Sequence, residues 1–174
     1  MRALIIVPLC LAAACSGGGG ENKAAQAADA MQPGQWEIGS EVAAFRSMDK
    51  AVPVLKAAVG DKSTATACIE PGKEAKPPPE MFAGAGYECD YKDTYLSAGR
   101  MVVSMECERG GVNGKINVAV EGNYTGDSFQ ATASTASLLP GEGDFEMSRK
   151  LSGRRTGPAC AAPGAGSPKG KAKA

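Results

Sequence analysis

The 174-residue chain contains no histidine, and this absence removes several kinds of active site at once. Ser-His-Asp and Cys-His triads, zinc sites with histidine ligands and HExxH helices all need an imidazole ring. Catalysis would have to rest on carboxylates, lysine, tyrosine or serine. The sequence has no recognisable catalytic motif, so we expect neither an enzyme nor a bound cofactor or metal.

Net charge and aromatic residues are also scarce. Nineteen basic residues balance 19 acidic residues, and this formal charge of zero gives no electrostatic reason to expect a nucleic-acid partner. Aromatic residues make up 5% of the chain, whereas it has 23 glycines and 11 prolines. This composition favours short strands and frequent turns over long helices.

No apolar run is long enough to span a membrane, but the first 14 residues have the character of an export signal. A single positive charge at Arg2 precedes a short apolar run, and three alanines, Ala12 to Ala14, lead to Cys15. This arrangement resembles the bacterial lipobox, which implies a signal peptide over residues 1–14 and acyl chains, palmitate among them, on Cys15. An ordinary secretory signal cut near Ala14 is the alternative.

The ends of the mature chain differ in composition from its middle. Residues 15–32 contain four consecutive glycines and predict a flexible tether, and residues 161–174 predict a disordered basic tail. Ser16 stands where many inner-membrane lipoproteins have aspartate, so the resemblance implies a protein anchored in the outer membrane and facing the periplasm. Residues 33–160 predict one β domain of ordinary size.

Residues 87–109 predict a β-hairpin around which the domain is organised. If Ser97, Ala98 and Gly99 form a three-residue loop, opposing residue numbers sum to 196 and Cys89 lies opposite Cys107. One face of this hairpin then carries a set of apolar residues and cysteines, namely Tyr87, Cys89, Tyr91, Tyr95, Met101, Val103, Met105 and Cys107.

Alternating apolar and polar residues predict five further strands. The first has Trp36, Ile38 and Val42 inward, and the second covers residues 62–69. Residues 115–124 and those from Phe129 onward form a second hairpin, with its turn at residues 125–126 and Gly122 opposite Phe129. The last strand alternates from Phe145. We therefore predict an all-β fold, a curved antiparallel sheet or open barrel of about seven strands in mainly meander order.

One or two short helical turns complete the expected fold. Residues 49–60 predict a short amphipathic helix, with Asp49 near its start and Gly60 after its end. Residues 70–86 contain four prolines and predict a loop with at most one turn of helix around residues 80–83.

Four cysteines remain in the mature domain, and an even count in an exported chain predicts disulfides. Three connectivities are open. The hairpin register favours Cys89 with Cys107, which leaves Cys68 with Cys160.

The opposite face of the hairpin brings like charges together, with Glu88 facing Glu108 and Asp90 facing Glu106. Three interpretations are open. The first, which we favour, is a solvated surface relieved by Lys92, Arg100 or Arg109. The others are a calcium-type cation site and a carboxylate acid/base pair.

The last strand has a basic end made of Arg149, Lys150, Arg154 and Arg155. We expect it to neutralise the acidic surface of the hairpin or to lie in solvent. Contact with anionic lipid is the alternative.

Five motifs follow one another along the chain: Pro-Gly-Gln-Trp-Glu at 33–37, Cys-Ile-Glu-Pro at 68–71, the Cys89 and Cys107 pair, residues 123–129, and Ser-Gly-Arg-Arg at 152–155 before the last cysteine. In this order they resemble a bacterial envelope family catalogued as domain of unknown function 3617. The resemblance covers about residues 33–160. It implies an exported small domain, often a lipoprotein, and it implies no activity.

The inward apolar residues of all strands form a face that cannot stay in water. A closed sheet, the proline-rich loop with the short helix, or an apolar ligand could cover it. We expect a binding or structural role. An apolar ligand, such as an acyl chain or peptide, or an envelope protein is the alternative partner, and a carboxylate-based hydrolase is a further alternative.

Overall fold

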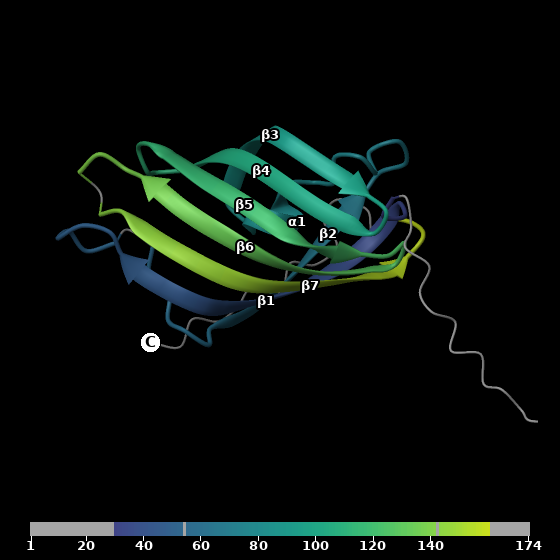
Figure 1. The fold of residues 1–174 in the computed structure, drawn as a ribbon, viewed down its shortest axis with the longest axis horizontal. Coiled ribbons are helices and arrows are strands. Elements are labelled where there is room, and N and C mark those ends of the chain that lie inside the picture. Colours follow the sequence, from purple (N-terminus) through teal and green to yellow (C-terminus); the bar gives the residue numbers. More distant parts are fainter. Residues whose placement is uncertain (1–29, 54, 142, 161–174) are drawn as a thin grey trace, which may run out of the picture.

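A computed structural model describes residues 30–160 except residues 54 and 142. These residues form one antiparallel sheet of seven strands that curls into a half-barrel (Figure 1). The strands are β1 Gly34–Ser47, β2 Lys62–Ile69, β3 Tyr87–Ser97, β4 Arg100–Arg109, β5 Lys115–Tyr124, β6 Ser128–Leu138 and β7 Phe145–Gly157, and the single helix of this part of the chain is α1 Glu80–Ala83. The predicted all-β curved sheet of about seven strands is confirmed. No helix in the described residues is long and apolar enough to cross a membrane.

The strand order is β2-β1-β7-β6-β5-β4-β3. Strands β3 to β7 follow one another as a meander, β1 pairs with β7, and β2 pairs with β1. The predicted meander is therefore confirmed for five consecutive strands. The two edges of the sheet are β2 and β3, which are consecutive in the chain but do not pair.

The concave face of the sheet carries the core. Strict alternation places every second side chain there, and burying each large apolar side chain contributes about 1.5 to 3 kcal/mol. The predicted inward residues that are fully buried are Trp36, Ile38, Val42, Met101, Val103, Met105, Ile116, Val118, Val120, Phe129, Phe145, Met147 and Leu151. The face is filled by its own side chains and by residues of the β2–β3 connection.

The first hairpin has a shorter turn than expected. Ala98 and Gly99 form a two-residue turn with φ of 49° and 77°, and the pairs next to it, such as Ser97 with Arg100, sum to 197. A bulge at Lys92 then adds one residue and restores Cys89 opposite Cys107. The predicted inward position of Tyr95 is wrong, because the bulge reverses the face of the residues beyond it: Tyr95 is 53% exposed.

The second hairpin differs by two residues from the predicted pairing. Gly122 lies opposite Ala131, and Phe129 lies opposite Tyr124. The predicted pair of Gly122 with Phe129 is wrong, although a shift of two residues leaves every side chain on its predicted face. The connection has three residues because the Thr125 hydroxyl accepts hydrogen bonds from the amides of Asp127 and Ser128, which closes the turn.

The helix predicted for residues 49–60 is absent, since the described residues there form bends and turns. The Asp49 carboxylate accepts hydrogen bonds from the amides of Ala51 and Asp144 instead of capping a helix. Pro53 lacks the amide that a first helical turn would need at this point. This connection is therefore tied to the β6–β7 loop.

The β2–β3 connection, residues 70–86, crosses the concave face. The registers place the end of β2 beside the start of β1 and the start of β3 beside the end of β4, so the connection must return along the whole half-barrel. Its helical turn α1 is where the sequence predicts it and packs against β2, β3 and β5, on the far side of the sheet in Figure 1. We call residues 70–86 the crossover segment.

The two ends of the half-barrel can be named from these connections. The entry end holds the start of β1, the β5–β6 turn at residues 125–127 and the end of β7. The loop end holds the connections at residues 48–61, 110–114 and 139–144.

Phe129 supplies a test of how tightly this core is packed. A Cβ added to Gly153, its partner on β7, would overlap the Phe129 ring, which lies 6.1 Å from the Trp36 ring and 5.9 Å from the Phe82 ring. Because that ring has no free side to move into, Gly153→Ala is expected to lower the free energy of unfolding by about 1 to 3 kcal/mol in urea denaturation.

Gly157→Ala on the same strand is the matched control. No heavy atom lies within 4 Å of its added Cβ, and its effect should stay within about 0.5 kcal/mol. Equal effects of the two substitutions would contradict this description of the core.

Candidate functional site

Two disulfides lie at opposite ends of the crossover segment. Cys68 is bonded to Cys160 at the entry end, and Cys89 is bonded to Cys107 near the loop end. Their Cα atoms are 5.5 Å and 4.0 Å apart. The pairing favoured from the hairpin register is confirmed. Each disulfide therefore fixes one of the two points between which the crossover segment runs.

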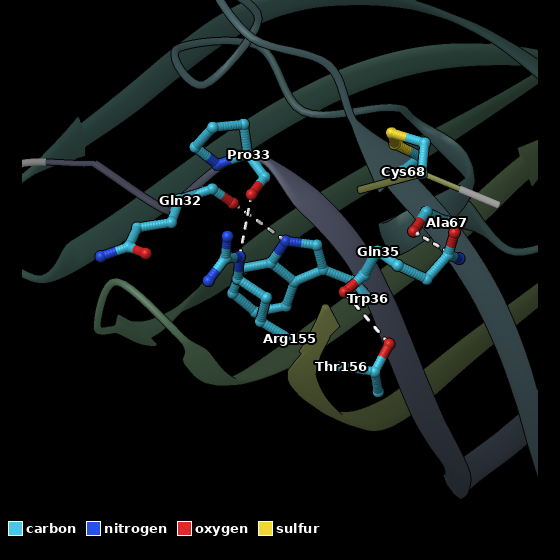
Figure 2. Close-up of a disulfide and its surroundings, with 9 residues drawn as sticks. Gln32, Pro33, Gln35, Trp36, Ala67, Cys68, Arg155 and Thr156 are labelled. Carbon is cyan, nitrogen blue, oxygen red and sulfur yellow. Dashed lines mark hydrogen bonds between the residues drawn. A yellow bond between two sulfur atoms is a disulfide. The ribbon is translucent and has the colours of Figure 1, made fainter. Parts of the chain in front are cut away.

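The entry end is sealed by the first described residues of the chain. Met31 is fully buried, and the Gln32 amide donates a hydrogen bond to the Gly126 carbonyl. Figure 2 shows the indole of Trp36 and the guanidinium of Arg155 directed at backbone oxygens of residues 32 and 33, at 3.1 Å and 2.8 Å. The chain is thus held firmly where it enters the domain. The predicted lipidation site, Cys15, lies outside the described residues.

Arg149 lies inside the half-barrel, and the prediction that it belongs to a basic surface is wrong. It is 9% exposed and points inward between Val42 and Ala133 of the neighbouring strands. The signal was present in the sequence, because Arg149 has the same odd numbering as the inward residues Phe145 and Met147. The inward position was not predicted because a charged side chain is expected at the surface.

The guanidinium of Arg149 holds the crossover segment. Its Nη2 atom donates hydrogen bonds to the Phe82 carbonyl at 2.7 Å and to the Ala83 carbonyl at 3.1 Å. Its Nε atom is buried without a hydrogen-bond partner, as are the hydroxyls of Thr94 and Thr135. Burial lowers the pKa of Arg149 from its ordinary value, and no carboxylate of the described residues forms an ion pair with it.

A second contact fixes the proline-rich part of the crossover segment. The Tyr91 hydroxyl donates a hydrogen bond to the Pro77 carbonyl. Burial, and to a smaller extent the Glu80 carboxylate, raises the pKa of Tyr91 well above its ordinary value, so its hydroxyl keeps the donated proton.

For the other basic residues of β7, one of the two expectations is met, since Arg154 and Lys150 lie mainly in solvent. Arg154 pairs with Glu37 at 3.5 Å and is largely in solvent, and Arg155 pairs with Asp127 at 3.3 Å. Neither pair involves the acidic hairpin. Lys150 is exposed on the same strand.

The acidic pairs of the hairpin form in the predicted register, Glu88 with Glu108 and Asp90 with Glu106. Lys115 of β5 forms ion pairs with both Glu106 and Glu108, a contact that the sequence analysis missed.

Lys92 pairs with Glu106 at 3.4 Å, as one interpretation expected, whereas the Arg109 guanidinium lies 5.1 Å from the centre of the Tyr87 ring. The described residues include no group of three or more acidic, cysteine or histidine side chains that could hold a metal ion.

A hollow of about 530 Å³ lies on the outer face of the sheet, opposite the core. A row of small residues crosses it in register, namely Ser104, Ala119, Ser134, Ser148 and Ala44. A hollow of about 430 Å³ lies at the loop end beside Val52, Pro53 and Leu55. A smaller one of about 130 Å³ lies at the mouth of the half-barrel, between Leu55, Tyr87, Arg109 and Phe145.

Lys115 permits a test of the acidic surface. Its hydrogen bond and charge lower the pKa of Glu108, and Glu108 in turn raises the pKa of Lys115. Lys115→Ala should therefore raise the pKa of Glu108 towards its ordinary value in an NMR titration of the carboxyl carbon. Lys56→Ala on the loop at residues 48–61 is the control and should leave that titration unchanged.

The direction of the pH effect follows from the signs of these shifts. A carboxylate whose pKa is lowered by folding stabilises the fold above its unfolded pKa, and the contribution disappears as the pH falls through its folded pKa. Lys115 contributes to the stability of the fold while it is protonated, and this contribution disappears at high pH, as the pH rises through its raised pKa. An unchanged Glu108 titration in Lys115→Ala would show that the ion pair does not form in solution.

Comparison with known proteins supplies a family but no activity. No curated protein and no solved structure matches the chain. The model of the family described as protein of unknown function (DUF3617) matches residues 31–160, which include all seven strands, the crossover segment and both disulfides. The resemblance drawn from the sequence motifs is confirmed at the level of the domain: the chain belongs to this DUF3617 family.

Proposed function

We propose that the protein is a lipoprotein, anchored in the outer membrane through Cys15 and facing the periplasm, whose domain has a binding or structural role. The observation that carries the proposal is that all four cysteines of the described residues are paired in two disulfides. Disulfides persist in oxidising compartments such as the bacterial periplasm and are rare in the cytosol. The export signal and the alanines before Cys15 supply the route and the anchor.

The domain's two ends suit an anchored binding module. The chain enters at the sealed entry end, so the tether attaches there and leaves the loop end accessible. Exposed apolar side chains lie at that end: Met48 is 47%, Val52 79% and Val59 68% exposed on the connection at residues 48–61, and Leu138 at the end of β6 is 61% exposed. Apolar side chains gathered at one end of a domain are suited to contact with an envelope protein or an apolar ligand.

The proposal assigns no catalytic role to the domain. The carboxylates that could serve as an acid/base pair lie on the exposed hairpin face, where lysines neutralise two of them. A hydrolase would need carboxylates that converge in a cleft and differ in pKa. Binding of a lipid is a second candidate function, because the unpaired Nε of the buried Arg149 could donate a hydrogen bond to an oxygen of its head group.

The anchor is tested by Cys15→Ser in the full chain, expressed in a Gram-negative host. Without the acyl chains the protein should move from the membrane pellet to the soluble periplasmic fraction, because no other segment is expected to hold it in the membrane. Cys10→Ser is the matched control, since Cys10 lies within the predicted signal and its loss should leave the protein membrane-bound. Retention of Cys15→Ser in membranes after a high-salt wash would overturn the anchor.

A further inference from the structure

Arg149 is a charged group of the core with an unsatisfied hydrogen-bond donor. A guanidinium has five N–H donors, and burying it without an anion is costly unless those donors are used. In this structure only Nη2 has hydrogen-bond acceptors, and both are neutral backbone carbonyls. The Nε donor is buried and unpaired. The site therefore offers a directed positive charge that no described side chain neutralises.

Other unsatisfied polar atoms lie on the same inner face. Thr94 occupies the same cross-strand row as Arg149, since Thr94 is opposite Val103 and the row continues through Val120 and Ala133. Thr135 lies in the adjacent row. The hydroxyls of both threonines are buried without partners. We call the concave face, with its apolar side chains, the trough. A polar group of a ligand lying in the middle of the trough would find hydrogen-bond partners there.

The two carbonyls that bind Arg149 belong to a short helical turn in the middle of the crossover segment. The helix α1 has only four residues and no side-chain cap, and it lies between three prolines and Gly84 and Gly86, both with positive φ. Disulfides fix the chain before and after the crossover segment. Both bonds lie outside α1, so they tie the sheet covalently whatever position α1 takes.

The buried side chains of α1 resemble an apolar tail lying in the trough. Met81, Phe82 and Ala83 are 1%, 0% and 3% exposed, and Phe82 packs edge-on against Phe129. Directly beside these apolar side chains, the carbonyl oxygens of Phe82 and Ala83 accept hydrogen bonds from the Arg149 guanidinium. A fatty acid would make the same two kinds of contact, apolar contacts through its chain and hydrogen bonds through its two carboxylate oxygens.

We propose that the concave face is a binding site for an amphiphile with one acyl chain and one carboxylate, which takes the place of α1. The carboxylate pairs with Nε and Nη2 of Arg149 in the bidentate geometry that guanidinium favours, and the acyl chain takes the positions of Met81 and Phe82. The mouth lined by Leu55, Tyr87 and Arg109 is the route of entry. This inference rests on the binding role proposed above and specifies its ligand.

The test measures binding of palmitate and of hexadecanol to the full chain carrying Cys15→Ser, by titration calorimetry. Palmitate should bind saturably with micromolar affinity and more tightly than the alcohol. Arg149→Met should weaken palmitate binding by roughly tenfold or more, since a hydrogen-bonded charge is lost, and leave hexadecanol unchanged. Arg154→Met is the matched control on the same strand, and it should bind both ligands as the unaltered chain does.

If the unaltered chain binds no palmitate, Phe82→Ala distinguishes a site that α1 keeps closed from a site that does not exist. The substitution removes the buried ring of α1 and leaves the Arg149 guanidinium unchanged. It should strengthen the binding of both ligands by about tenfold. With palmitate labelled with ¹³C at the carboxyl carbon, the bound carboxyl should titrate with a pKa below that of the free acid, and this readout does not depend on Arg149→Met being folded.

Two results would overturn the site. One is no saturable palmitate binding to either the unaltered chain or Phe82→Ala. The other is a bound carboxyl whose pKa is not lowered, together with equal palmitate affinities for Arg149→Met and Arg154→Met. Membrane fractionation of Cys15→Ser is a separate measurement, so an anchored protein that binds no palmitate would refute this inference and leave the anchor standing.

Discussion

The concave face of the sheet must be covered, and the other features of the fold follow from that requirement. The side chains of the strands fill this face from one side, but a single curled sheet with unpaired edges β2 and β3 has no second layer to close the other side. The crossover segment supplies that cover, because the parallel directions of β2 and β3 force it back along the trough. Arg149 holds it through backbone carbonyls of α1, and Tyr91 holds its proline-rich part. The core is therefore complete only when this one connection is in place.

The disulfides are best understood through the same constraint. In the chain-entropy model, closing loops of 92 and 18 residues contributes about 4.6 and 3 kcal/mol. Their positions matter as much as their number, since one lies before and one after the crossover segment. Each disulfide joins the sheet at a point outside α1, so neither bond depends on the position of α1. A domain built in this way can combine a stable sheet with a cover of low local stability.

Much of this fold could be predicted from the sequence, because period-two alternation holds along most of each strand and needs no knowledge of the partner strand. The prediction failed where one residue changes the alternation: Ala98 adopts a positive φ that non-glycine residues rarely take, and the bulge at Lys92 leaves no mark in the pattern. Lys115 was missed because its partners depend on the register of β4 with β5. Arg149 has an odd residue number, like the other inward residues of β7, but a charged residue is expected at the surface unless a partner for its charge is known.

Native-state hydrogen exchange at the α1 amides would show whether α1 can leave the concave face while the sheet stays folded. The amides of Phe82, Ala83 and Gly84 are hydrogen-bonded within the turn and are protected when it is closed. We expect them to exchange through an opening of lower free energy than the amides of β5 and β6, with little dependence on denaturant. Exchange of the α1 amides only through global unfolding, with the same free energy and denaturant dependence as the sheet, would contradict this expectation.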